Sequence, residues 1–310
     1  MFRTLSRLVN FALIITLATG AAAEDSKRSL VLLSDFGTTE RFVASMKGVA
    51  MSVDPSLQVH DLTHHIEPFN IWQASYMLAG TIDFWPAGTV FVSVVDPGVG
   101  TDRRSVVAKT RTGHFVVTPD NGSLTLVADK QGIVEIRQID ETVNRRPGSE
   151  SSHTFHGRDV YAYTGARLAA AVIQFDAVGP LLEPDFVRLP YQQPKSLDDE
   201  SLVGSVAHVE MPFGNVVTNI PKALVDALGL SPEDHSTVLV EIRHAGNLVF
   251  KRRIPYTVSF GYVDQGTPLL YSDSLQTIGL AVNSGNFAQW FGVEAGADWV
   301  INISKPPAQK

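Results

Sequence analysis

The sequence predicts a chain of two parts, an α/β domain followed by a smaller domain made mostly of β-strands. Between residues 29 and 180, short apolar segments alternate with segments that have helical spacing. Such alternation is typical of a sheet with helices packed on both faces. After residue 201 the apolar segments are short, rich in β-branched residues and separated by turns. This second pattern favours a small β-barrel or sandwich.

The elements of the first part follow from the periodicity of its apolar residues. A short β-branched run bounded by turn residues predicts a strand, and apolar side chains recurring every three or four positions predict a helix. Two strands on either side of Thr112-Gly113 are expected to form a hairpin. The expected strands are 29–34, 57–62, 89–95, 105–110, 114–118 and 133–139, and the expected helices are 42–53, 71–85, 124–130 and 160–173.

A change in composition marks the boundary between the two parts. Pro184, Pro190 and Pro194 precede an acidic run at 198–200, and such clusters are typical of a linker. We therefore predict an α/β domain over 24–190, a linker over 191–201 and a β-barrel domain over 202–310. The expected strands of the second part are 202–210, 215–220, 237–243, 248–260, 269–273 and 299–303, and its expected helices are 222–228 and 277–283.

The first residues have the features of a secretory signal peptide. Arg3 and Arg7 precede an apolar core over 8–17, and a run of alanines ends at Ala23, just before an acid. The core is short for a membrane span, and small residues before a charge are typical of a cleavage site. We expect residues 1–23 to be removed on export and the mature chain to be periplasmic, without further membrane attachment. An uncleaved N-terminal anchor is the alternative.

Composition narrows the classes of function that the chain can have. It carries 32 acidic and 25 basic residues, for a net charge of −7 at pH 7. An acidic chain whose longest basic block is 251–253 is poorly suited to binding nucleic acid. The sequence contains no cysteine, which excludes thiol catalysis, disulfides and zinc sites built on cysteine. A small molecule is the expected partner.

The most informative segment is 94–104, where a predicted buried strand ends in an acid, a Pro-Gly turn and a basic pair. Asp96 stands at the carboxyl end of that strand, where open α/β sheets bind their ligands. The turn forms a tight loop, which allows Arg103 to fold back and pair with Asp96. A second glycine-containing segment, 154–159, contributes His156. An acid, an arginine and a histidine on such turns are suited to handling a proton beside a small ligand.

Other motifs have both a functional and a structural interpretation. Asp35, after the first strand, can hold the two hydroxyls of a ribose or cap the following helix. Phe213 and Asn215 offer a ring face and an amide that suit a purine, but loop geometry alone also accounts for them. His64 and His65 suggest a metal, but no acid or third histidine stands at a ligand spacing nearby. A turn histidine with a satisfied hydrogen bond is therefore favoured.

Together, the ordered motifs of this chain resemble the S-adenosylmethionine hydroxide adenosyltransferase family, which is related to the fluorinase and chlorinase that use S-adenosylmethionine. The resemblance implies a Rossmann-like N-terminal domain, a C-terminal β-barrel and a homotrimer whose active sites lie between neighbouring subunits. The matching motifs are 34–37, 61–64, 95–100, 119–122, 154–159 and 213–220.

The resemblance also implies an activity and a set of functional residues. The implied reaction is hydrolysis of S-adenosylmethionine to adenosine and L-methionine, by attack of activated water at ribose C5′, with no metal and no cofactor. Asp96, Arg103 and His156 are the implied catalytic residues. The fluorinase carries Tyr at the positions of Asp96 and His156 and Ser at that of Gly157, so this chain resembles a hydrolase. The implied substrate-binding residues are Asp35, Glu40, Phe69, Glu210, Phe213, Asn215, Phe260 and Ser274.

Two positions depart from the family pattern, and two other functions remain open. Glu40 and Glu210 stand where relatives usually have Asp. Each keeps the negative charge but has a longer side chain, which affects how the amino-acid part of the substrate would be bound. The export signal supports, as an alternative, a periplasmic protein that binds a nucleoside or S-adenosylmethionine without turnover, but the intact set of Asp96, Arg103 and His156 argues against it because binding alone needs no group that handles a proton. Halide-dependent transfer is a third interpretation, which the residues at 96, 156 and 157 disfavour.

Overall fold

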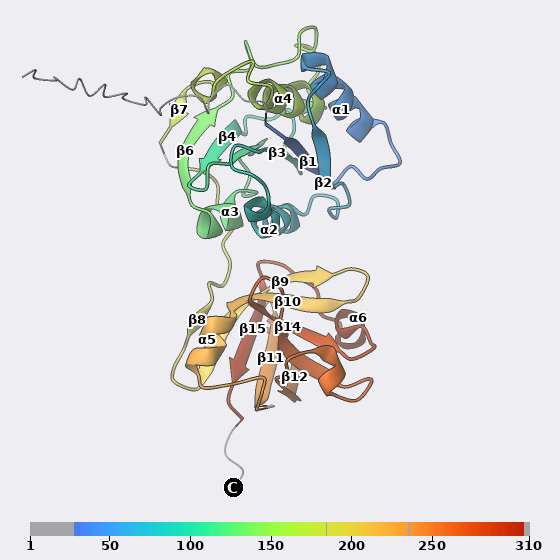
Figure 1. Cartoon of the computed structure of the whole chain (residues 1–310), viewed down its shortest axis with the longest axis vertical. Coiled ribbons are helices and arrows are strands. Elements are labelled where there is room, and N and C mark those ends of the chain that lie inside the picture. The colour runs from blue at the N-terminus through green and yellow to red at the C-terminus, as the bar shows by residue number, and fades with distance from the viewer. Residues whose placement is uncertain (1–27, 184, 235, 307–310) are drawn as a thin grey trace, which may run out of the picture.

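The structure is a computed structural model, and it describes residues 28–183, 185–234 and 236–306. The predicted signal peptide, residues 1–23, lies outside the described residues. The chain forms a mixed α/β region and a β-rich region joined by an extended segment (Figure 1). Over the part of the chain that the structure describes, no helix is long and apolar enough to cross a lipid bilayer.

The N-terminal region is built on a seven-stranded sheet. Its strands are β1 (Leu30–Ser34), β2 (Val59–Thr63), β3 (Val90–Val94), β4 (Ser105–Thr110), β5 (Phe115–Pro119), β6 (Ile133–Gln138) and β7 (Leu181–Leu182). They lie in the order β2-β1-β3-β5-β4-β6-β7, with β2, β1, β3 and β5 parallel. The predicted hairpin is confirmed, because β4 and β5 pair antiparallel. Strands β1, β3 and β5 are buried along their whole length, as expected for runs of β-branched residues covered on both faces.

Helices cover both faces of this sheet, as the alternation of segments predicts. They are α1 (Phe42–Val53), α2 (Ile71–Thr81), η1 (Ile82–Phe84), α3 (Thr125–Lys130), η2 (Gly157–Ala162), α4 (Tyr163–Ala169) and η3 (Phe175–Val178). One face packs on α1, η2 and α4, where Met46 and Ala166 join the core. The other packs on α2 and α3 through Leu78 and Val127.

The helix predicted over 160–173 differs from the expectation at both ends. It begins earlier, as the π-helical turn η2, which follows directly on His156 and runs into α4. It ends at Ala169, because Ala171 adopts a left-handed backbone with φ of 57°. Single π-helical turns of this kind occur frequently at functional sites.

The C-terminal region is an eight-stranded sheet that curls until its two ends nearly meet. Its strands are β8 (Lys195–Ser196), β9 (Ser201–Glu210), β10 (Asn215–Pro221), β11 (Thr237–His244), β12 (Asn247–Pro255), β13 (Pro268–Ser272), β14 (Thr277–Val282) and β15 (Trp299–Ser304). The order is β12-β11-β15-β9-β10-β14-β13, and β8 pairs with β9. Tyr256, just after β12, bridges to Leu270 of β13 and so brings the ends of the sheet together. The sheet is therefore nearly barrel-shaped.

The prediction of a helix over 277–283 is wrong, because this segment contains strand β14. It pairs with β10 on one side and β13 on the other. Ile278, Leu280 and Val282 alternate along it and enter the interior core, which is the two-residue period of a strand. The predicted helix near 222–228 is confirmed as α5 (Lys222–Ala227). The structure also contains α6 (Phe287–Phe291) and the short η4 (Phe260–Tyr262), which were not predicted.

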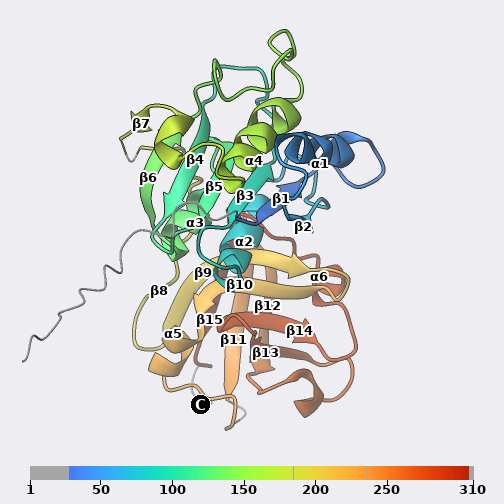
Figure 2. The same ribbon diagram turned by 45° about the horizontal axis from the view of Figure 1, so that its top comes forward.

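The two regions contact each other through α2 and β9. The indole Nε1 of Trp72 donates a hydrogen bond of 2.9 Å to the carbonyl of Ala207. The ring of Tyr76 stacks on His208 with centroids 4.7 Å apart. Figure 2 shows α2 beside β9, the strand that it contacts.

Candidate active site

A cavity of about 270 Å³ opens at the carboxyl ends of β1 and β3. Asp35 follows β1, Asp96 follows β3, and His156 immediately precedes η2. Phe69 also lines this cavity. The structure thus brings together four residues that the sequence analysis selected from separate segments, at the sheet edge where parallel strands usually bind ligands.

An aromatic cluster that the sequence analysis did not identify forms one wall of this cavity. The ring centroids of Phe36 and Phe42 lie 5.4 Å apart, and those of Phe42 and Phe155 lie 5.3 Å apart. Phe36 and Phe155 meet edge to face at 5.7 Å. Such a wall limits hydration of the cavity, and charges beside it interact more strongly than they would in water.

Gly157 borders both this aromatic wall and the cavity. A Cβ atom at position 157 would lie 3.0 Å from Val94 Cγ1 and 3.3 Å from the Phe36 ring. A side chain at position 157 therefore needs the Val94 side chain or the Phe36 ring to give by a few tenths of an ångström.

Asp96 and Arg103 form the predicted ion pair, in a two-point geometry. Arg103 donates from Nε to Oδ1 at 2.8 Å and from Nη2 to Oδ2 at 2.5 Å. Their side chains are only 5% and 11% exposed. Arg103 Nη1 also donates to Ser105 Oγ at 3.0 Å, and the hydroxyl of Tyr161 donates to Asp96 Oδ2 at 3.3 Å. Burial raises the pKa of Tyr161, so this hydroxyl stays a donor. The carboxylate is fixed in orientation from two sides.

His156 lies between two arginines. Its Nδ1 is 3.0 Å from Arg103 Nη2, and its Nε2 is 3.2 Å from Arg145 Nη2. Guanidinium groups only donate, whereas a neutral imidazole offers one lone pair and an imidazolium offers none. Burial lowers the pKa of His156, and Arg103 and Arg145 lower it further against the opposite effects of Glu141 and Asp96. The net shift favours the neutral form of the imidazole.

Arg145 and Glu141 belong to this site, and the sequence analysis did not identify them. They lie in the loop after β6, where Arg145 Nη2 donates to Glu141 Oε2 at 2.5 Å. An acid four residues before a base is a spacing typical of helices. Residues 141–145 do not form a helix, and the spacing alone indicates no ligand. Only the folded chain brings the pair to His156.

Asp35 does not cap the following helix, so that interpretation is wrong. Its Oδ2 accepts a hydrogen bond of 2.9 Å from the backbone N–H of Phe69, and the residue at the start of α1 is Arg41. Phe69 itself has φ of 69° and a side chain 70% exposed. Asp35 thus fixes the loop that carries Phe69 over the cavity.

His64 is a satisfied turn histidine, as favoured from the sequence. Its Nδ1 lies 2.6 Å from Ser34 Oγ and its Nε2 lies 3.0 Å from Asp61 Oδ1. Its carbonyl accepts from the N–H of Gly37, which ties this turn to the loop carrying Asp35. Within the described ranges, no group of three or more His, Asp or Glu side chains is arranged to hold a metal ion.

The predicted binding residues of the C-terminal region do not line this cavity within one chain. Glu210 accepts from the amide of Asn215 at 3.1 Å, across the β9–β10 turn. Phe213 on that turn is 68% exposed. Phe260 packs on Tyr271 with centroids 4.9 Å apart, and Ser274 is exposed. In the N-terminal region, Glu40 is exposed and also does not line the cavity.

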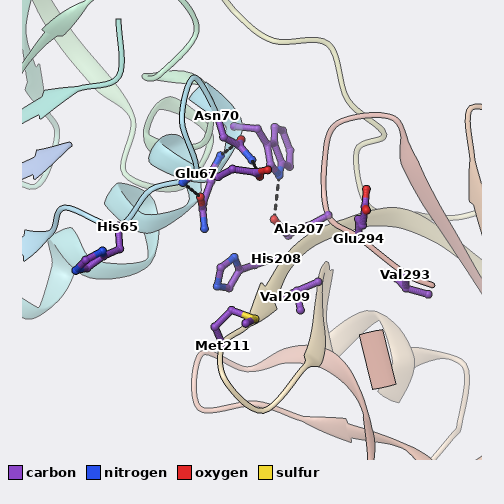
Figure 3. Close-up of a pocket in the computed structure, with 12 residues that line it drawn as sticks. His65, Glu67, Asn70, Ala207, His208, Val209, Met211, Val293 and Glu294 are labelled. Carbon is purple, nitrogen blue, oxygen red and sulfur yellow. Dashed lines mark hydrogen bonds between the residues drawn. The ribbon is translucent and has the colours of Figure 1, made fainter. Parts of the chain in front are cut away.

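A larger cavity of about 420 Å³ lies between the two regions (Figure 3). His65 and Glu67 line it from the N-terminal side, and His208 and Met211 line it from the β9 side. Asp96, Arg103 and His156 are not among its lining residues. We therefore assign the proton-handling chemistry to the smaller cavity.

Comparison with known proteins gives consistent matches over both regions. The description "SAM hydroxide adenosyltransferase N-terminal domain" matches residues 30–179, and its C-terminal counterpart matches 204–300. The chain is 35% identical over 223 residues to the (R)-S-adenosyl-L-methionine hydrolase of Methanocaldococcus jannaschii, which covers 71% of this chain and 75% of that protein. It is 26% identical over 290 residues to the fluorinase of an Actinoplanes species, covering 86% and 95%. A crystal structure of an uncharacterized conserved protein from Thermotoga maritima matches with a TM-score of 0.78 and 35% identity, over 89% of this chain and 100% of that one.

Proposed function

This chain belongs to the S-adenosylmethionine hydroxide adenosyltransferase family, and on that basis we propose that it hydrolyses S-adenosylmethionine to adenosine and L-methionine. The observation that carries the proposal is the buried group of Asp96, Arg103 and His156 at the edge of a partly aromatic cavity. Relatives of similar length are named (R)-S-adenosyl-L-methionine hydrolase. We extend that name to this chain and expect the R configuration at sulfur to be accepted.

The reaction needs help at the nucleophile rather than at the leaving group. A bond forms between the water oxygen and C5′ of the ribose while the C5′–S bond breaks, and its electron pair neutralises the sulfonium as a thioether. The leaving methionine therefore needs no proton. Water becomes more acidic as it attacks, so a group that orients it and accepts its proton lowers the barrier.

The three proposed catalytic residues can share this work. Asp96, held by Arg103, orients the water, and neutral His156 accepts its proton, because imidazole titrates near neutrality. His156 has a free lone pair for this proton only if one arginine contact opens. Both arginines are held by further hydrogen bonds, so the attacking water has to displace one of these two contacts with His156. Attack on a cation destroys charge, and a dry cavity favours such a step.

The remaining expectations from the resemblance are part of this proposal. Asp35 would hold the ribose hydroxyls, and Phe213 with Asn215 would face the adenine. We further propose a Rossmann-like N-terminal domain, a C-terminal barrel and a periplasmic location after signal cleavage. No metal or cofactor is proposed, because a thioether leaving group requires no Lewis acid. A source of substrate outside the cytoplasm then has to exist.

Purified mature protein is expected to convert S-adenosylmethionine into adenosine and methionine in the presence of a chelator. Both sulfonium epimers should be supplied separately, and products followed by chromatography. In water labelled with oxygen-18, the label should enter the adenosine 5′-hydroxyl. Label elsewhere, or loss of activity with the chelator, would contradict the mechanism.

The same assay separates the alternative functions. A protein that only binds would retain S-adenosylmethionine without forming products. A halide-dependent transferase would form a 5′-halogenated nucleoside when chloride or fluoride is added, and we expect none. The related fluorinase is only 26% identical, and this chain has Asp96, His156 and Gly157 at the positions that distinguish the two branches.

We propose that the site is completed by a neighbouring copy in a homotrimer. The cavity is lined by residues of the N-terminal region, whereas the proposed adenine contacts, exposed Phe213 and buried Asn215, lie at and just after the β9–β10 turn. Phe69 at the cavity and Phe213 on that turn are 70% and 68% exposed. Both rings are therefore accessible to a neighbouring copy.

Two inactive variants are expected to restore activity when they assemble together. Asp96→Asn removes the charge of the N-terminal half-site, and Phe213→Ala removes the ring of the C-terminal half-site at little cost in packing. If sites lie between subunits, about a quarter of the sites in randomly mixed trimers carry neither substitution. Light scattering should report three copies. No recovery after co-expression, or a monomer with full activity, would contradict the shared site.

A further inference from the structure

Arg145 has an unusual set of contacts for a loop arginine. Its Nη1 donates to the carbonyls of Ser149 at 3.2 Å and Ser152 at 3.1 Å. Its Nη2 donates to Glu141 and faces His156 Nε2. The side chain is only 10% exposed. Arg145 is thus bonded on one side to its own loop and on the other to Glu141, and it lies directly against the imidazole, so its position determines what the ring contacts.

Glu141 links Arg145 back to the catalytic pair. Its Oε1 accepts from Ser105 Oγ at 3.3 Å, and Ser105 Oγ accepts from Arg103 Nη1 at 3.0 Å. Arg103 in turn faces His156. The contacts therefore close into a ring of side chains that runs through Arg103, Ser105, Glu141, Arg145 and His156. A closed network of this kind holds each member more firmly than isolated pairs would.

We infer that Arg145, anchored by Glu141, is a positioning residue for His156, which it keeps neutral and oriented toward the Asp96–Arg103 pair. The inference deepens the proposed function, because it assigns the control of His156 to a second ion pair. His156 has to be neutral whether it takes the proton from water itself or only accepts a hydrogen bond from Arg103. An imidazolium can neither accept a proton from water nor accept a hydrogen bond from Arg103.

Four charged groups face His156, and they act on it in opposite directions. Burial lowers the pKa of His156; Arg103 and Arg145 also lower it, while Glu141 and Asp96 raise it. Removing Arg145 should therefore raise the pKa, and removing the charge of Glu141 should lower it. Activity that needs neutral His156 falls as pH drops through this pKa. The acidic limb of the pH–rate profile should therefore move to higher pH when Arg145 is removed and to lower pH when the charge of Glu141 is removed.

The test is a titration of His156 in substrate-free protein, followed by pH–rate profiles. Histidine labelled with carbon-13 at Cε1 gives the signal, which is assigned by its loss in His156→Asn. Arg145→Met is expected to raise the midpoint by roughly one pH unit, and Glu141→Gln to lower it by a similar amount. The limb of kcat against pH should shift in the same directions. Arg145→Lys should restore the midpoint in large part, since it restores the charge.

Arg137→Met is the matched control for a purely structural effect. Arg137 bonds Glu135 at 2.9 Å and the carbonyls of Gly179 at 3.0 Å and Asp176 at 3.4 Å, so it repeats the bonding of Arg145 without a histidine. This control should lose comparable stability and leave the His156 midpoint unchanged. Unchanged midpoints in Arg145→Met and Glu141→Gln, or shifts of the same sign, would overturn the inference. If neither epimer is hydrolysed, the proposed function fails, but the titration still decides the role of Arg145.

Discussion

Asp96→Asn is expected to reduce turnover by roughly 100- to 10,000-fold while S-adenosylmethionine still binds. The amide keeps the size of the carboxylate but removes the charge that orients the water. In the wild-type chain, Arg103 donates to both carboxylate oxygens of Asp96. In the variant, the NH₂ group of the asparagine would face one of these donor nitrogens. Single-turnover kinetics and calorimetric binding measure the two effects separately.

Asp120→Asn provides the matched control for this substitution. Asp120 forms a similar ion pair with the next arginine in the chain, Arg104, at 2.6 Å, and its side chain is 2% exposed. Leaving one member of a buried pair uncompensated costs about 3–5 kcal/mol of stability, and an asparagine substitution should cost less. Both variants should therefore lose stability, but only Asp96→Asn should lose turnover. Equal losses of turnover would assign Asp96 a structural role alone.

His156→Ala is expected to lower turnover by roughly 100-fold or more with substrate affinity nearly intact. Because burial lowers the pKa of His156 below its ordinary value of 6.5, the wild-type chain should stay active to a lower pH than an exposed histidine would allow. Activity should then fall as the ring becomes protonated. Rates measured between about pH 4 and pH 8 locate this limb, and His156→Ala should lack it.

His156→Asn distinguishes the two ways in which this residue can serve the site. An asparagine oxygen can accept the hydrogen bond from Arg103, but it cannot take a proton from water. If His156 is the proton acceptor, the Asn variant should be as slow as the Ala variant. Substantial activity in His156→Asn would leave Asp96 as the base. Normal turnover in a well-folded His156→Ala protein would remove His156 from the chemistry altogether.

The fold could be predicted from the sequence where the apolar period was clear. The helix at 42–53 and the hairpin of β4 and β5 were predicted because their patterns match one element only. β14 was mistaken for a helix because a short run of apolar and small residues fits both periods. The short α6 was missed because a single turn with Phe287 buried gives almost no periodic signal.

The Asp96–Arg103 ion pair could be predicted because both residues lie in one loop. The turn after β3 limits how far Arg103 can be from Asp96, and the structure confirms that they meet. Arg145 and His156 lie in two different loops that meet only in the folded chain, so no local sequence pattern predicts their contact. From the sequence, Glu141 could be recognised only as an acid four residues before Arg145. The residues of the C-terminal region were selected through the family resemblance, and their contacts with substrate stay a prediction.

The π-helical turn at η2 has a consequence for comparing this chain with its relatives. A helix advances by about 100° for each residue, so one inserted or deleted residue between Gly157 and Ala162 would rotate His156 about the axis of α4. The imidazole would then swing away from Arg103 and Asp96, although every motif would remain readable in the sequence. We therefore expect a gap in this segment of an alignment to mark a homologue in which His156 no longer meets Arg103.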